Sequence, residues 1–317
     1  MLRLAGWGQF PPPAGQPGST AIHKDSSVFV GWATGCTVLR GPKNIADLSL
    51  GLVSYGDSTK ALGVADNSVV SLGDGGQAVL TFAHPIADGP GWDFAVFENG
   101  FSDTFLELAF VEVSSDGEHF VRFPATSLTQ DSVQVGPFGS LDATQIDNLA
   151  GKYRTLYGTP FDLQVLAGHP GLNVQAITHV RVVDVVGSIQ PAFASYDQYG
   201  NAVNDPWPTP FESGGFDLDA VGVIHTIHTA VQERPPVFLN LSPQPARDFV
   251  ILMNSAATPV QAIHIFNGAG QKVQSFGPLP GFSQHWIPLN NLPAGWYFAK
   301  ITMAQEGEVV LKLLISK

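Results

Sequence analysis

Residues 187–215 carry the side chains whose types and spacing most suggest chemistry. Oxygen-bearing side chains stand there at relative positions 1, 5 and 9, as Asp197, Asn201 and Asp205. Calcium takes six to eight oxygen ligands, so this spacing indicates a calcium-binding loop. The alternative is an Asx-rich loop whose side chains cap their own backbone, which Tyr199 at position 3 favours. The segment spans 29 residues without a strand pattern, and loops of that length are usually functional or disordered.

Aromatic residues of this loop are typical of a surface that stacks on sugars or other planar ligands. Trp207 has prolines on both sides, and prolines keep a chain stiff and extended. A ring held rigidly offers contact area at low entropic cost, with Tyr199 as a second ring and Asn204 as a polar contact. Trp92 is a separate candidate for the same role. The alternative for Trp207 is a ring folded back over the edge of the domain.

Two aspartates in an expected strand form a second candidate metal site. Asp217 and Asp219 alternate, so both should point to one face of the strand. Leu218 and Ala220 should then take the other face. Neighbouring carboxylates repel unless a cation or hydrogen-bond donors lie between them. The sequence predicts either a metal ion here or acids that are solvated or accept loop amides.

Acids also interrupt the apolar runs. Glu107 and Glu112 are five residues apart in one such run, so they should face opposite sides of a strand. At least one should lie near the core, where a carboxylate needs a partner. Residues 98–100, Glu-Asn-Gly, end another run and predict a turn rather than a site.

Catalytic motifs are few, and no catalytic residue is predicted. Ser54 misses the Gly-x-Ser-x-Gly elbow by one residue. His225 and His228 would lie on opposite faces of a strand. Neither a P-loop nor a dinucleotide fingerprint occurs. A carboxylate pair for glycan hydrolysis stays open, because its spatial separation is not visible in a sequence.

The elements that must position these residues are almost all strands separated by turn residues. Glycines 73, 75 and 76 predict a hairpin between residues 69–72 and 77–82, and Asp116-Gly117 predicts another. Only residues 142–152, with Asp142 as N-cap, predict a short helix. Many short strands indicate an all-β protein with a jelly-roll β-sandwich. The other expected strands are 94–97, 105–113, 120–123, 179–186 and 220–227.

Charge divides the chain into two domains. Residues 1–236 hold 10 Lys and Arg against 24 Asp and Glu, whereas residues 237–317 hold 5 against 3. A net charge of −12 leaves no basic stripe for nucleic acid. No apolar run reaches the 18 residues typical of a membrane span, and a single cysteine excludes an internal disulfide. The expected parts are an N-terminal extension (1–19), a ligand-binding domain (20–230), a linker (231–236) and a C-terminal domain (237–317).

The larger domain resembles known jelly rolls. Residues 105–123 and 214–225 are similar to modules of the galactose-binding, discoidin and carbohydrate-binding type. In those modules an aspartate at the position of Asp219 can ligate a structural calcium. Residues 65–225 also resemble bacterial cell-surface proteins that are exported and retained on the envelope. The resemblance implies a cellular location for the protein rather than an activity.

The C-terminal domain resembles the sorting domain of the type IX secretion system. The matching features are a start at Leu241-Ser-Pro-Gln-Pro-Ala, a strand at 262–266 leading to a glycine–lysine turn, and Leu292-Pro-Ala-Gly-Trp-Tyr. Gln244 and Gln271 depart from the family pattern. The resemblance implies an Ig-like β-sandwich that an outer-membrane translocon reads, and export to the outer surface of a Gram-negative cell.

Together these features predict a secreted, non-catalytic binding protein whose ligand is a carbohydrate or another small molecule. Three alternatives stay open. The protein could capture a vitamin cofactor such as cobalamin for an outer-membrane transporter, hydrolyse a glycan, or act as a structural or adhesive surface protein.

Overall fold

A computed structural model describes residues 10–227, 239–255, 257, 259–303 and 307–316. The chain divides into two compact units, a front unit (residues 1–228) and a tail unit (residues 229–317). The expected linker and the first nine positions of the expected N-terminal extension lie outside the described residues. Within the described part, no helix is long and apolar enough to cross a membrane.

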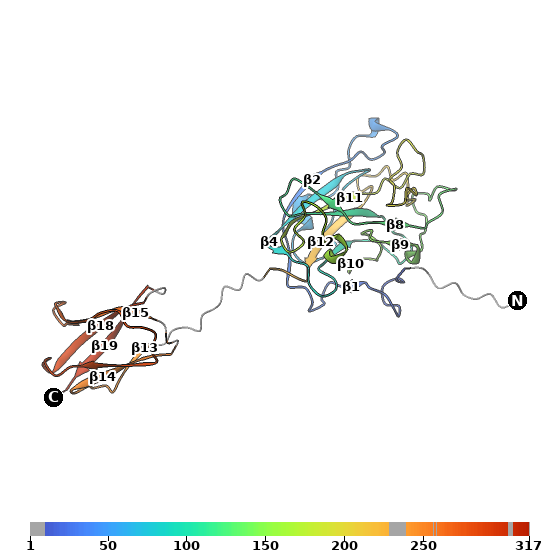
Figure 1. Ribbon diagram of the computed structural model, residues 1–317. Helices are drawn as coiled ribbons and strands as arrows, with labels where there is room; N and C mark the ends of the chain where they lie inside the picture. Colours follow the sequence, from blue (N-terminus) through green and yellow to red (C-terminus); the bar gives the residue numbers. More distant parts are fainter. Residues whose placement is uncertain (1–9, 228–238, 256, 258, 304–306, 317) are drawn as a thin grey trace. The chain divides into compact units, whose positions relative to one another are not determined.

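The front unit consists of β-strands joined by long loops and four single-turn 3-10 helices (Figure 1). The strands are β1 (Ile22–His23), β2 (Gly31–Leu39), β3 (Val70–Ser71), β4 (Gln77–Ile86), β5 (Phe94–Glu98), β6 (Ala109–Ser114), β7 (Val121–Arg122), β8 (Thr126–Ser127), β9 (Ile146–Asp147), β10 (Tyr157–Phe161), β11 (Ile177–Asp184) and β12 (Asp217–Val223). The 3-10 helices are η1 (Leu48–Leu50), η2 (Ser58–Ala61), η3 (Ala143–Gln145) and η4 (Leu163–Leu166).

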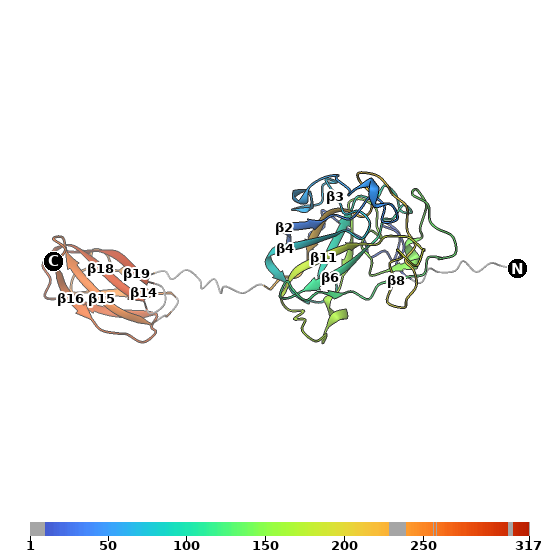
Figure 2. The same cartoon turned by 90° about the horizontal axis from the view of Figure 1, so that it is seen from above.

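One long antiparallel sheet curls over the core of this unit. Its strand order is β1-β10-β5-β12-β2-β4-β11-β6-β7, with β3 added on β12. Strand β2 joins the halves, because residues 31–32 pair with β12 and residues 33–39 with β4. Figure 2 shows β2, β4, β11 and β6 side by side in this order. Valines from both halves share one buried cluster, including Val96, Val221, Val111 and Val180. The predicted all-β, sandwich-like fold is confirmed, whereas its assignment to a jelly roll stays a prediction.

Burial patterns explain why these segments are strands. In β11 the buried residues Val180, Val182 and Asp184 alternate with half-exposed ones, as expected for a strand with one face on the core. Every residue of β12 is buried, which indicates that both its faces are covered. The end of β12 where Asp217 lies is therefore inside the protein.

Two predicted local structures differ from the structure. Strand β3 pairs with β12 and not with β4, because the backbone N–H groups of Leu72 and Gly73 donate to the carbonyls of Phe216 and Gly214 and continue that pairing. The predicted helix at 142–152 is a single 3-10 turn. Asp142 does cap it, but Ile146 is extended and pairs with Ser127. The predicted turn at Asp116-Gly117 is confirmed, since β6 pairs with β7.

The tail unit is a separate small β-sandwich. Its two sheets have the orders β13-β14-β17 and β16-β15-β18-β19, and they enclose a hydrophobic cluster drawn from residues 239–315. Gln244 is one of the two residues that depart from the sorting-domain pattern. Its side-chain amide donates to the carbonyl of Lys312 and accepts from the N–H of Leu314, and so holds β19 in place. The strands are β13 (Leu239–Ser242), β14 (Phe249–Asn254), β15 (Val260–Asn267), β16 (Lys272–Phe276), β17 (Gln284–Pro288), β18 (Gly295–Met303) and β19 (Gly307–Ile315).

Candidate functional site

The structure buries the tryptophan that the sequence places on the surface. Trp207 is only 5% exposed, and its Nε1–H donates to Oδ2 of Asp74 at 3.0 Å. Its ring also packs beside Phe193, with ring centroids 6.4 Å apart. The prediction of a displayed, stacking Trp207 is wrong, because the indole N–H finds a buried acceptor and the stiff segment runs inward. Its alternative, a ring folded back over the domain, describes the structure.

Asn204 also has a structural role and not the exposed one expected for a ligand contact. The residue is fully buried. Its Nδ2 donates to the carbonyls of Gln130 and Val133, and its Oδ1 accepts from the N–H of Val135 and from Gln134. All hydrogen-bonding positions of the amide are therefore used to hold residues 130–135 against the loop.

The expected calcium loop is held together by its own hydrogen bonds. Asp197 accepts from the backbone N–H groups of Ser127, Tyr199 and Asn201, and from the Asn201 side chain. Burial opposes ionisation of Asp197, but the donors outweigh it and lower its pKa. The carboxylate of Asp205 does not join these hydrogen bonds and instead accepts from the N–H of Leu108 at 2.8 Å. The spacing 1, 5, 9 thus produces a capped Asx loop, the alternative reading of this segment.

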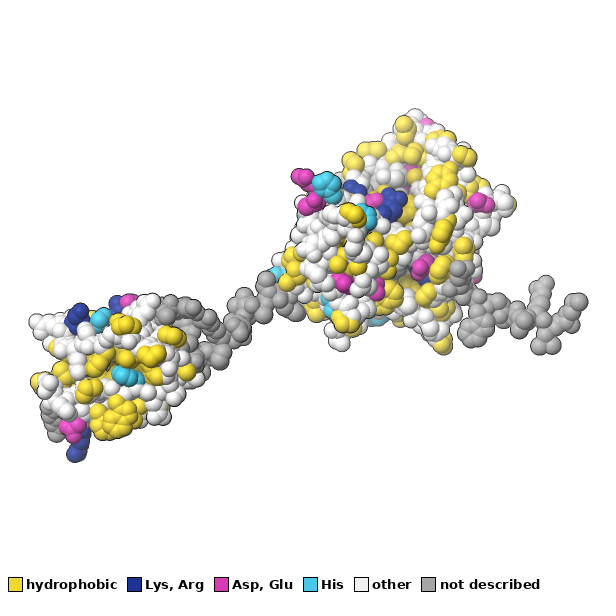
Figure 3. All heavy atoms as spheres, in the orientation of Figure 1, with side chains coloured by type: hydrophobic (Ala, Val, Ile, Leu, Met, Phe, Trp, Pro, Cys, Tyr) yellow, Lys and Arg dark blue, Asp and Glu magenta, His cyan; other side chains and the backbone are white. Residues whose placement is uncertain are grey.

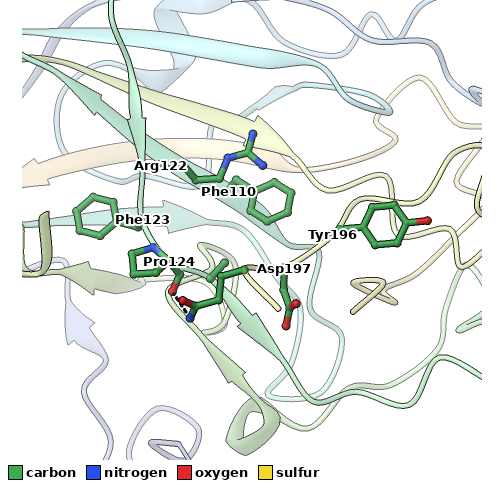
Figure 4. A pocket seen from close by; sticks show the side chains of 8 residues that line it. Phe110, Arg122, Phe123, Pro124, Tyr196 and Asp197 are labelled. Atoms are coloured by element: carbon green, nitrogen blue, oxygen red, sulfur yellow. Dashed lines mark hydrogen bonds between the residues drawn. The ribbon is translucent and has the colours of Figure 1, made fainter. Parts of the chain in front are cut away.

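A pocket of about 320 Å³ lies where this loop meets the chain after β7. We call it the Tyr196 pocket (Figure 4). Gln198 holds one wall, because its Nε2 donates to Thr126 Oγ1 at 3.0 Å and to the Pro124 carbonyl at 3.4 Å. Its Oε1 accepts no hydrogen bond from the described residues. The lining residues are Phe110, Arg122, Phe123, Pro124, Ala125, Tyr196, Asp197 and Gln198.

The pocket lies beside a carboxylate that binds two guanidinium groups. Glu112 is buried, and its two oxygens form ion pairs with Arg122 and Arg181. The Arg122 guanidinium also stacks on the Phe110 ring, 4.1 Å from its centroid, as Figure 4 shows. Two cations against one anion leave a local positive charge in a unit that is otherwise acidic. Nη1 of Arg122 makes no hydrogen bond within the described residues and stays free for a ligand.

One exposed ring of the loop, Tyr196, lines the pocket, and a second exposed ring, Tyr199, is not among the lining residues. Tyr196 lines the pocket and is 46% exposed, and Tyr199, close to it in sequence, is 72% exposed. The expected exposure of Tyr199 is therefore found. Trp92 is 39% exposed, but it precedes β5 and does not line the Tyr196 pocket. Figure 3 shows that uncharged side chains dominate the drawn face of the molecule, which fits the low fraction of charged residues.

Asp217 and Asp219 do not share surroundings as the strand alternation predicts. The register of β12 against β5 shifts between Leu218 and Ala220, and these two residues pack in different hydrophobic clusters. Asp217 accepts from the hydroxyl of Ser71. Asp219 accepts from the backbone N–H groups of residues 66 and 67. A β-bulge therefore breaks the alternation and gives the two acids separate partners.

Six carboxylates nevertheless gather at one end of the sandwich, and we call them the buried carboxylate group. They come from the end of β5, the segment before β6, the end of β11, the start of β12, the turn after β3 and the long loop. Among the described residues, no Lys, Arg or His forms an ion pair with any of them. The members are Asp74, Glu98, Glu107, Asp184, Asp205 and Asp217.

The electrostatics of this group disfavour ionisation. Burial raises the pKa of Asp217 to about 7. Burial also raises the pKa of Glu98 well above its usual range, and the charges of Glu107 and Asp217 raise it further. The pKa values of Asp184 and Asp205 are raised well above their usual range, first by burial and then by neighbouring acids. The group therefore needs shared protons or a cation to be stable.

A second set of acids lies at the opposite end of β5. The side-chain oxygens of Asp88, Asp93 and Asp162 come within 4.8 Å of one another. Asp93 is saturated, since it accepts from Leu163, Gly89 and His225. Asp162 caps helix η4 through the N–H of Gln164. Both oxygens of Asp93 and one oxygen of Asp162 therefore serve local hydrogen bonds, whereas Oδ1 of Asp88 is buried and has no partner among the described residues.

The sequence did not single out most of this chemistry. The sequence predicts a turn at Glu98, and Oε2 of Glu98 does accept from the N–H of Gly100. At least one of Glu107 and Glu112 is expected to lie near the core with a partner, and the buried Glu112 does form ion pairs with Arg122 and Arg181. A usable signal is that several of these acids stand where an apolar run meets glycine or proline, as in Phe97-Glu98-Asn-Gly100. The arrangement of six separate segments around one point is a tertiary property.

Comparison with known families concerns the tail unit. Residues 240–316 match the family described as "Secretion system C-terminal sorting domain". The chain carries a type IX sorting domain. The protein is therefore secreted through this system to the cell surface or beyond, as predicted from the strands and turns of the tail. No curated protein matches the sequence.

Solved structures similar to the chain are distant. A biofilm-associated protein (BSP domain) is 10% identical over 76% of this chain and 48% of its own, with a TM-score of 0.23. A β-1,2-glucanase from Parabacteroides distasonis is 8% identical over 94% of this chain and 39% of its own, with a TM-score of 0.24. The adhesin domain of Epf from Streptococcus pyogenes is 10% identical over 77% and 74%, with a TM-score of 0.19. The chain thus spans less than half of the first two structures, and such low scores support no argument about function.

Proposed function

We propose that the front unit is a non-catalytic carbohydrate-binding module displayed at the cell surface, with the Tyr196 pocket as its site. The observation that carries this proposal is the half-exposed Tyr196 ring on a pocket that also offers a guanidinium and a side-chain amide. Sugars present apolar faces for stacking and hydroxyl groups that both donate and accept. The ring, Nη1 of Arg122 and Oε1 of Gln198 match these three needs.

The pocket supports binding rather than hydrolysis. Glycoside hydrolysis uses two carboxylates on either side of the scissile bond. Asp197 is the one carboxylate in the lining, and four hydrogen bonds fix both its oxygens to the loop. It therefore has neither a second acid nor a free oxygen with which to act.

A glycan array probed with the full chain tests the proposal. Tyr196→Ala should weaken retention about tenfold, the loss of roughly 1.4 kcal/mol of stacking, and should leave the melting temperature unchanged. Tyr55→Ala is the matched control, because Tyr55 is 54% exposed but does not line the pocket. Equal retention by both variants would remove the pocket from the binding site.

The array, together with binding assays on cobalamin and on whole cells, separates the alternatives. Retention of cobalamin but of no glycan would favour nutrient capture for a transporter. Release of shorter products from a retained glycan would favour a hydrolase, and binding to cells without binding to any glycan would favour an adhesive role.

A further inference from the structure

A second pocket lies over strands β2, β4 and β11 of the long sheet. Its volume is about 530 Å³, and we call it the His179 pocket. Two glycines keep it hollow, because a Cβ on Gly35 would overlap Oγ1 of Thr81, and a Cβ on Gly117 would come 2.8 Å from Cε1 of His179. Threonines and an imidazole therefore line an open space. The lining residues are Gly35, Cys36, Thr37, Val79, Thr81, Gly117 and His179.

One row of side chains joins this pocket to the Tyr196 pocket. Strand pairing places five residues opposite one another in turn, namely Thr37, Val79, Arg181, Glu112 and Arg122. Residues directly opposite each other lie on the same face of a sheet, so the row begins in the His179 pocket and ends at Arg122 in the Tyr196 pocket. Strands β4 and β7 are three strand spacings apart, about 14 Å. A ligand that fills both pockets is therefore a chain rather than a single ring.

The middle of this row presents positive charge to solvent. The Glu112 side chain is 7% exposed, whereas those of Arg122 and Arg181 are 43% and 27% exposed. The two guanidinium groups thus reach the surface, while the carboxylate that pairs with them does not. Nη1 of Arg181, like that of Arg122, makes no hydrogen bond within the described residues. Charged groups form the strongest hydrogen bonds, so an anionic group is the best ligand for this part of the row.

The one acid in the lining of the two pockets does not oppose an anionic ligand strongly. Asp197 lines the Tyr196 pocket, but its carboxylate is stabilised by four hydrogen-bond donors of the loop. Residues 1–236 are otherwise rich in Asp and Glu. An anionic ligand is therefore repelled by most of the front unit and directed to the arginine pair.

The next inference rests on the proposed function and names the class of glycan. We propose that the ligand is an acidic polysaccharide chain that spans both pockets and places a carboxylate or sulfate group on Arg122 and Arg181. Sugar units at one end stack on Tyr196. Units at the other end lie in the His179 pocket, where the hydroxyls of Thr37 and Thr81 donate to and accept from sugar hydroxyls.

An array of acidic and neutral glycans of different lengths, probed with the full chain, tests the proposal. Long uronic-acid or sulfated glycans should be retained about tenfold more strongly than neutral glycans of the same length, and more strongly than acidic disaccharides. Comparison of the uronic-acid and sulfated members shows which anion the arginines bind. Arg181→Gln should weaken retention of the long acidic glycans about tenfold, and Arg181→Lys, which keeps the charge, should weaken it less.

Thr37→Glu tests the His179 pocket separately, and it covers the case of an Arg181 variant that does not fold. Thr37 is exposed and lines the pocket, so the new carboxylate should repel an acidic chain there. Retention of long acidic glycans should fall about tenfold, whereas retention of acidic disaccharides and the melting temperature should not change. Thr34→Glu is the matched control, because Thr34 is an exposed threonine of the same strand that lines neither pocket.

The outcomes separate this inference from the proposed function. Retention of neutral glycans alone would overturn the inference, and so would full retention of long acidic glycans by Thr37→Glu. In both cases sensitivity to Tyr196→Ala would leave the Tyr196 pocket as the binding site. Retention of no glycan would instead contradict the proposed function itself.

Discussion

Replacing Trp207 distinguishes a structural tryptophan from a ligand-stacking one. Trp207→Phe keeps an aromatic ring but removes the Nε1–H that donates to Asp74 at 3.0 Å. Burial already raises the pKa of Asp74, and the indole hydrogen bond opposes that rise. A hydrogen bond to a charged group contributes about 1.5–3 kcal/mol. We therefore expect Trp207→Phe to lower the free energy of unfolding of the front unit by about that amount.

Trp207→Ala should cost more, because it also leaves a cavity. A buried tryptophan changed to alanine loses about 3–5 kcal/mol, and for a unit of this size 1 kcal/mol corresponds to about 2–4 °C. The expected falls in melting temperature are roughly 3–12 °C for Trp207→Phe and 6–20 °C for Trp207→Ala. Calorimetry of the full chain is the assay, with the tail transition as an internal standard because the tail has its own core.

Trp92→Ala is the matched control, since Trp92 is 39% exposed and its loss should leave the melting temperature within about 2 °C. The reasoning is refuted if Trp207→Ala leaves the melting temperature unchanged and abolishes glycan retention. That result would mean that the ring is displayed to ligands and does not pack inside the unit.

Three further predictions concern the front unit. Asn204→Ala should lower the free energy of unfolding of the front unit by about 2–4 kcal/mol in urea titrations, because four buried hydrogen bonds are lost. A change below about 0.5 kcal/mol would contradict the conclusion that Asn204 holds residues 130–135 against the loop. In chelator, stability should fall as pH rises above about 4, since the folded state holds the proton of Asp205 more tightly than the unfolded chain. Asp205→Asn should flatten that slope, and an unchanged slope would argue against this assignment. A chain ending at residue 228 should keep the front-unit melting temperature, whereas a shift of more than about 5 °C would show that the tail supports that core.

The features that the sequence predicted well depend on local patterns. Strands and turns of the tail follow from alternating apolar residues and glycine turns within short segments, and the pairing of β6 with β7 follows from Asp116-Gly117. The all-β class likewise follows from many short apolar runs separated by turn formers. Two departures from the sorting-domain pattern proved compatible with the fold, because Gln244 bonds to β19 and Gln271 closes a turn with Asn267.

The features that the sequence could not predict depend on where the chain goes in space. Trp207 and Asn204 stand in a polar, proline-rich loop, and nothing local shows that the loop packs inward against Asp74 and residues 130–135. The alternation of Asp217 and Asp219 fails at a bulge, which depends on the pairing of β12 with β5. The buried carboxylate group joins six segments from residue 74 to residue 217, so its members become neighbours only when the sheet is complete.

A crystal structure of the chain with the glycan that the array retains best tests the central claim most directly. The account predicts that the sugar lies against the Tyr196 ring, with its hydroxyl groups within hydrogen-bonding distance of Gln198 and Arg122. A sugar bound elsewhere on the front unit, for example at Trp92, would contradict it.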